Sequence, residues 1–108
     1  MKLYIGGAYQ GQLELARAEN PDALILADFH ETVHEAMRRG EDARAFAQSV
    51  VAAHPDAVIV ANEVGAGVVP IKAQERAFRE AVGRALCVVA QASEQVTRVV
   101  CGIGVRIK

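Results

Sequence analysis

Short apolar runs alternate along this chain with longer stretches in which apolar residues recur at helical spacing. The apolar runs predict strands at residues 2–5, 23–28, 57–61, 96–101 and 105–108, the last as a short edge strand. Helices are predicted at residues 13–19, at 43–54 and from Lys72 onward, with a turn at 31–39 before the second of them. Strands that alternate with helices predict an α/β fold, with a mostly parallel sheet and flanking helices, in a single domain over residues 1–108.

The composition narrows the class of protein. A chain of 108 residues can bury one hydrophobic core. Its hydrophobic content of 52% and its net charge of −1 argue against disorder and against a nucleic-acid-binding surface, which would be strongly basic. No apolar run reaches the ~18 residues of a membrane span and no signal-peptide core follows Met1, so a cytoplasmic location without a membrane partner is expected. Cys87 and Cys101 lack metal-ligand spacing and are expected to be packed free thiols.

The most informative segment, residues 61–70, reads Ala-Asn-Glu-Val-Gly-Ala-Gly-Val-Val-Pro and joins a predicted strand to a predicted helix. Ligand sites of open α/β sheets lie at such carboxyl ends of strands. Asn62 and Glu63 supply an amide and a carboxylate there, and Gly65 permits close approach of the backbone to a ligand. The alternative is a tight loop in which glycine serves only the backbone conformation.

A second glycine-rich loop follows the first predicted strand and reads Gly6-Gly7-Ala8-Tyr9-Gln10-Gly11-Gln12-Leu13. Gly6 and Gly11 have the spacing of the P-loop motif G-x-x-x-x-G-K-[ST], which cradles phosphates. Gln12 and Leu13 replace the lysine and the hydroxyl residue, so the phosphates lose a cation and Mg²⁺ loses a ligand. The backbone of the loop could still bind an anion weakly, or its glycines could serve only to shape a turn.

Residues 61–70, the segment Arg76-x-Phe78-Arg79 and the segment 101–108 together resemble one protein family. This is the bifunctional adenosylcobinamide kinase / adenosylcobinamide-phosphate guanylyltransferase family of cobalamin biosynthesis, and the resemblance covers residues 57–108. It implies a reduced P-loop NTPase (RecA-like) architecture, weak binding of GTP or ATP, a nucleotide or corrinoid as ligand, and a homo-oligomer, which in the family is a trimer. The binding residues that it implies are Gly6, Gly7, Ala8, Gly11, Gln12, Asn62, Glu63, Gly65, Arg76 and Arg79.

Several departures from the family pattern affect its chemistry. The segment that carries the guanylyl-accepting histidine in the family has no counterpart between residues 19 and 23, and none of the chain's three histidines takes its place. The family's acidic residue after the second strand falls on Ala27, with Asp28 one residue late, and its helical asparagine falls on Leu86. The resemblance therefore predicts a degenerate member without catalytic residues, which binds a ligand at most.

One motif indicates different chemistry. The segment His30-Glu31-Thr32-Val33-His34 matches H-E-x-x-H, in which two histidines one helical turn apart bind Zn²⁺ and the glutamate acts as general base. His30 would stand at the start of its helix, and Met37 replaces the glycine of the extended motif. We therefore expect no metal. A small zinc-dependent hydrolase and a non-catalytic assembly or interaction module remain as alternatives.

Overall fold

A computed structural model of the chain describes residues 1–63 and 72–108. Its elements are β1 (Lys2–Gly6), α1 (Gln12–Glu19), β2 (Ile25–Leu26), α2 (Phe29–Arg38), α3 (Ala43–Ala53), β3 (Val58–Asn62), α4 (Ala73–Ala92), β4 (Gln95–Val100) and β5 (Ile103–Arg106). The strands form one sheet in the order β2-β3-β1-β4-β5, in which only β5 is antiparallel to its neighbour. The predicted α/β class with a mostly parallel sheet is confirmed, in an arrangement consistent with a reduced P-loop NTPase-like fold.

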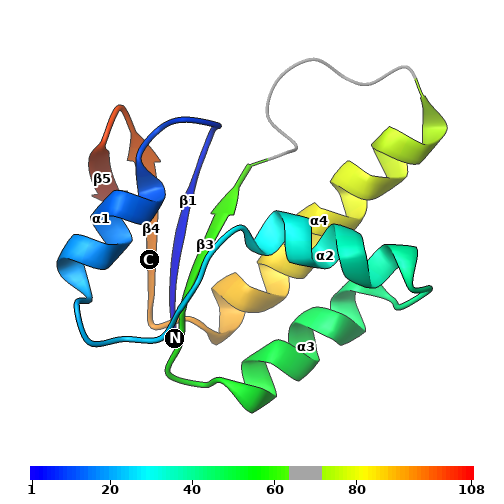
Figure 1. Cartoon of the computed structure of the whole chain (residues 1–108), viewed down its shortest axis with the longest axis horizontal. Helices are drawn as coiled ribbons and strands as arrows, with labels where there is room; N and C mark the ends of the chain where they lie inside the picture. The colour runs from blue at the N-terminus through cyan, green and yellow to red at the C-terminus, as the bar shows by residue number, and fades with distance from the viewer. Residues whose placement is uncertain (64–71) are drawn as a thin grey trace.

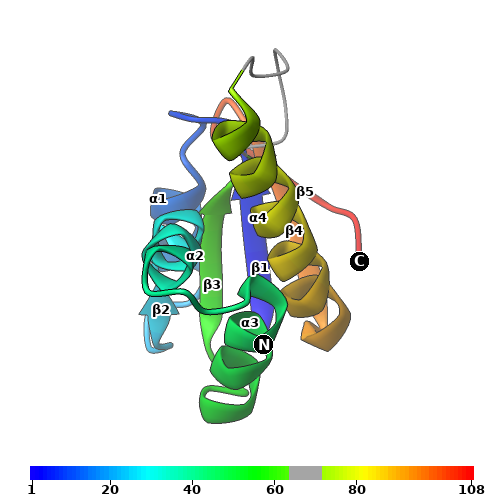
Figure 2. The ribbon, with the colours of Figure 1, turned by 90° about the vertical axis from the view of Figure 1, so that its right-hand side faces the viewer.

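Helices cover both faces of the sheet (Figure 1). On one face, α1 buries Ala16 in a cluster that includes Tyr4 of β1 and Val60 of β3. On the other face, α2, α3 and α4 bury their apolar sides in a second cluster, which includes Phe29 and Val82. Figure 2 shows α4 lying across the strands on this second side. Among the helices of the described residues, none is long and apolar enough to span a membrane.

The parallel pairing of β1 and β3 places the two predicted ligand loops side by side. Gly6, the last residue of β1, is in register with Asn62, the last residue of β3. The Glu63 N–H also donates to the Gly6 carbonyl oxygen at 2.8 Å, which extends the pairing by one step. Both loops therefore leave the sheet at the same edge, as expected for neighbouring parallel strands.

The segment predicted as a turn at 31–39 is a full helix, α2. It ends because Gly40 adopts a φ of 83°, a conformation that glycine tolerates without a Cβ clash. The Gly40 N–H donates to Met37 O at 2.9 Å and the Glu41 N–H donates to Ala36 O at 3.0 Å, which is the Schellman pattern. The helix predicted at 43–54 is confirmed as α3, with the Asp42 side chain accepting from Ala45 N–H at its start.

Two strands differ from the prediction. The strand expected at 23–28 is reduced to Ile25–Leu26, and it ends early because Asp28 turns away with a φ of 53°. The last strand begins at Ile103, since Cys101 and Gly102 form a tight turn with φ values of 51° and 75°. The expectation of packed thiols is wrong, because the side chains of Cys87 and Cys101 are both exposed.

A network of hydrogen bonds connects β1 with the end of α1. The buried Tyr4 hydroxyl donates to Glu19 Oε1 at 2.7 Å and accepts from Asn20 Nδ2 at 3.0 Å. Asn20 Oδ1 in turn accepts from Lys2 Nζ at 3.0 Å. Burial, together with the hydrogen bond to the Glu19 carboxylate, raises the pKa of the Tyr4 phenol above 10.0.

We expect this network to make folding sensitive to high pH. The folded state holds the Tyr4 proton more tightly than the unfolded state, so its contribution to stability is complete below pH 10.0 and declines as the pH rises above that value. In a Tyr9→Phe variant, Tyr4 is the only tyrosine, and its ionisation can be followed by phenolate absorbance while circular dichroism reports the fold. The midpoint of Tyr4 ionisation is expected to lie above pH 10.0. A midpoint at or below pH 10.0, measured while the protein is still folded, would contradict the prediction.

Candidate functional site

An open cleft of about 600 Å³ lies at the carboxyl ends of β1 and β3. Its walls come from the loop after β1, the start of α1, the start of α2 and the end of β3. The residues that line it are Ala8, Tyr9, Gly11, Gln12, Leu13, Glu14, Asp28, His30, Glu31, Val60, Ala61 and Asn62. Four of the predicted binding residues, Ala8, Gly11, Gln12 and Asn62, therefore meet in one cleft. Gly6 and Gly7 join them indirectly, through the side chain of Gln12.

The side chain of Gln12 turns inward, toward the protein. Gly11, with a φ of 89°, ends the loop and lets α1 begin at Gln12. The Gln12 Nε2 atom lies 3.1 Å from Gly6 O, 3.0 Å from Gly7 O and 3.0 Å from Asn62 Oδ1, and the residue is only 5% exposed. The two hydrogens of this amide are thus used on acceptors of the protein itself. A neutral amide occupies the place of the P-loop lysine and joins the two strand ends.

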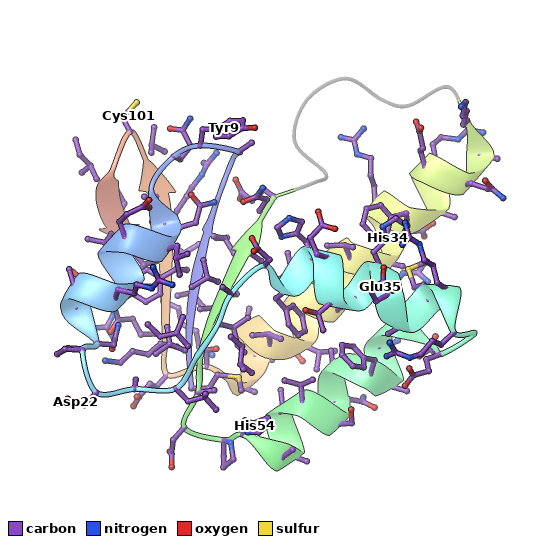
Figure 3. All side chains as sticks on the ribbon, viewed as in Figure 1. Tyr9, Asp22, His34, Glu35, His54 and Cys101 are labelled. Atoms are coloured by element: carbon purple, nitrogen blue, oxygen red, sulfur yellow. The ribbon has the colours of Figure 1, made fainter. Side chains whose placement is uncertain are left out.

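The loop after β1 is held from its outer side by the β4–β5 turn. The Gln10 Oε1 atom accepts from Cys101 N–H and the Gln10 carbonyl oxygen accepts from Gly102 N–H, both at 2.7 Å. The neighbouring Tyr9 has a φ of 61° and is 103% exposed, so its ring projects freely at the rim of the cleft. Figure 3 shows Tyr9 and Cys101 together at this end of the sheet.

The first turn of α2 forms the opposite wall. The buried His30 accepts a hydrogen bond at Nδ1 from the Asn62 backbone N–H, with N···N 3.1 Å, and so ties α2 to the end of β3. In the neutral imidazole the proton then sits on Nε2, which faces Glu31 Oε1 at 3.7 Å. His34 is one turn further along, and its ring lies 4.2 Å from the ring of Phe78, measured between centroids. Within the described residues, no group of three or more His, Cys, Asp or Glu side chains could hold a metal ion.

The other predicted binding residues lie outside the cleft. The Glu63 carboxylate is 26% exposed and 3.7 Å from Arg98 Nε on β4, and it does not line the cleft. Arg76 and Arg79 lie in the first two turns of α4 and are also absent from the lining. Gly65 is outside the described residues.

The structure adds lining residues that the sequence analysis had not marked as binding residues. Tyr9 and Leu13 come from the P-loop-like segment, and three carboxylates, Glu14, Asp28 and Glu31, come from the first turns of α1 and α2 or just before them. The available signal was positional: Glu14 and Glu31 follow predicted strands, Asp28 ends one, and all three stand at or near the start of a helix. Because parallel strands open on one edge, residues at these starts converge there.

Comparison with known proteins gives a consistent result. The model of the CobU family, described as cobinamide kinase / cobinamide phosphate guanyltransferase, matches residues 14–107. Two relatives described as bifunctional adenosylcobalamin biosynthesis protein CobU, from Salmonella typhimurium and Escherichia coli, are each 49% identical over 51 residues. The alignment covers 47% of this chain and only 28% of each relative. Because the family match spans most of the chain, this protein belongs to the cobinamide kinase / cobinamide phosphate guanyltransferase family.

Proposed function

We propose that this chain is a degenerate member of its family, which binds a nucleotide or a corrinoid of cobalamin biosynthesis without phosphorylating it or transferring a guanylyl group. The observation that carries the proposal is the inward-facing amide of Gln12, bound to Gly6 O, Gly7 O and Asn62 Oδ1. The activities named for the full-length relatives are not assigned to this chain, because it covers only 28% of their length.

Phosphoryl transfer depends on positive charge beside the transferred group. Gln12 is neutral, and its donors are turned away from the cleft toward protein acceptors. Leu13, the next residue, lines the cleft but has no oxygen to hold Mg²⁺. The P-loop-like segment therefore keeps the shape of a phosphate loop while it lacks both groups that would stabilise the reaction.

Guanylyl transfer in this family requires a nucleophilic histidine. His30 is the histidine that lines the described cleft, and its Nδ1 lone pair is engaged by the Asn62 N–H. The neutral ring then presents a protonated Nε2, which is not a nucleophile. His54 is exposed at the opposite end of the sheet (Figure 3), and the His34 ring lies tilted against the Phe78 ring. This arrangement favours binding over covalent chemistry, and nothing in the described residues favours a zinc hydrolase.

A cytoplasmic homo-oligomer, such as a trimer, is part of the proposal. The support for the oligomer is the last hairpin, where Ile103 is 68% exposed, Val105 55% and Ile107 60%. Apolar side chains clustered on a surface are typical of contacts between proteins. The same observation favours the second candidate function, a non-catalytic assembly module.

Thermal unfolding in the presence of GTP, GDP or adenosylcobinamide tests the proposed binding. A ligand of the folded state raises stability by RT ln(1 + [L]/Kd), so at least one of these compounds should raise the Tm in a concentration-dependent way. We expect Asn62→Ala, which changes the cleft, to reduce this shift, and His54→Ala, at the other end of the sheet, to leave it intact. If none of the three compounds raises the Tm, the binding proposal is wrong and the assembly module is favoured.

A further inference from the structure

The charge of the cleft is opposite to that of a phosphate-binding site. Glu14, Asp28 and Glu31 line it, and no lysine or arginine is found among its described lining residues. Glu14 stands in the first turn of α1, where a P-loop protein would receive the phosphates. A phosphate group placed there would be repelled by three carboxylates, in an open cleft where solvent screens part of the interaction.

Neighbouring positive charges do not offset the negative charge of the cleft. Arg98 lies outside the cleft lining and is 3.7 Å from the Glu63 carboxylate. Arg76 and Arg79, in the first two turns of α4, are also absent from the lining. The amide of Gln12, which could otherwise donate to a phosphate, is used on Gly6 O, Gly7 O and Asn62 Oδ1.

The rim of the cleft offers a different kind of contact. The Tyr9 ring is fully exposed and lines the cleft at the apex of a loop that Gln10 anchors to the β4–β5 turn. An aromatic side chain held on an anchored loop is suited to stack on a planar ring. Carboxylates at the start of α1 and α2 can accept hydrogen bonds from the hydroxyl or amide groups of such a ligand.

We infer that the cleft binds the phosphate-free form of its ligand, a planar ring compound without negative charge, in preference to the phosphorylated form. The ring would lie against Tyr9, with its polar edge toward Glu14, Asp28 and Glu31. This inference rests on the proposed binding function and specifies its ligand class. An intact P-loop would have the opposite preference, for the phosphorylated form.

The test uses two matched pairs, guanosine with GTP and adenosylcobinamide with adenosylcobinamide phosphate. Each is titrated calorimetrically into the purified protein at low ionic strength without Mg²⁺. In any pair that binds, the phosphate-free member should bind about tenfold tighter or more, since a single phosphate ester adds ~1.5 to 2 negative charges at neutral pH and a triphosphate adds more. Added salt should narrow this ratio, because it screens the charges.

Variants separate the charge effect from the ring contact. The triple change Glu14→Gln, Asp28→Asn and Glu31→Gln should move the ratio of the two affinities toward one, mainly by strengthening the binding of the phosphorylated ligand. Asparagine tolerates the φ of 53° at position 28, so the fold is expected to survive. Asp22→Asn, at the far end of the sheet (Figure 3), removes a carboxylate outside the cleft and should leave the ratio unchanged. Tyr9→Ala should weaken the binding of the phosphate-free ligand by about tenfold.

Each outcome has a defined meaning. Tighter binding of the phosphorylated member, or a ratio that the triple variant leaves unchanged, would overturn the inference while the proposed binding function stands. If none of the four compounds binds, the inference and the binding proposal both fail. Formation of a phosphorylated product would overturn the proposed function, and it is measured separately, by the transfer of labelled γ-phosphate.

Discussion

The purified protein, supplied with ATP or GTP, Mg²⁺ and adenosylcobinamide, is expected to form no phosphorylated product above the uncatalysed background. Removing one preorganised donor from a site of developing charge typically lowers kcat by about 10²–10³. Here Gln12 replaces a cation and Leu13 replaces a metal ligand, so a rate about 10⁴-fold or more below that of an intact P-loop enzyme is expected. Transfer of labelled γ-phosphate to the corrinoid measures this directly.

A variant that restores the motif provides the control. Gln12→Lys with Leu13→Ser should strengthen triphosphate binding, because an ammonium group and a hydroxyl return to the cleft edge. Gln48→Lys, which adds the same charge at an exposed position on α3, should have no such effect. Full recovery of turnover is not expected, because Ala27 leaves the acidic position after β2 empty. Robust phosphorylation by the unaltered chain would contradict the proposed loss of chemistry.

Replacing Gly6 with alanine is expected to destabilise the fold by about 3 kcal/mol, the upper part of the range for overpacked cores. A Cβ at this position would lie 2.5 Å from Val99 O, a backbone atom of the neighbouring strand, and 3.3 Å from Gln12 Nε2. The strand cannot yield as a flexible side chain would. For a domain of this size the loss corresponds to a fall in Tm of more than ~10 °C, measurable by calorimetry.

Gly7→Ala is the matched control, one residue away. Its Cβ would meet only the Gln10 Cγ atom at 3.7 Å, an ordinary van der Waals contact. The same chemical change should therefore alter stability by less than ~1 kcal/mol. Equal Tm values for the two variants would show that the close approach of β1 and β4 does not require glycine at position 6.

The fold was predictable because its strands are apolar and its helices are periodic. The stripe that includes Phe46 and Val50 correctly located α3, and the run before Asn62 located β3. The errors in the strand bounds arose where one residue adopts a left-handed φ that no apolar pattern records. Asp28 ends the second strand in this way, and Cys101 moves the start of β5 to Ile103.

The candidate site was predictable in part. The loss of charge at Gln12 could be seen in the sequence, but the direction of its amide could not, since that direction depends on Asn62, 50 residues away. Glu14 carries no motif in the sequence, Asp28 is considered there only as a displaced acidic residue, and Glu31 only as part of the H-E-x-x-H segment. Their significance depends on their meeting in one cleft, which requires the sheet.

The anchor between Gln10 and the β4–β5 turn has a consequence for the order of folding. Gln10 Oε1 and Cys101 N–H are separated by 91 positions in the chain, so this contact requires the closure of a very long loop. The pairing of β1 with β4, which matches Lys2 with Gln95, closes a loop of about the same length and is itself a late event. Once these strands have paired, the anchor costs little further loop entropy, so we expect the ligand loop to become rigid together with the pairing of β1 and β4.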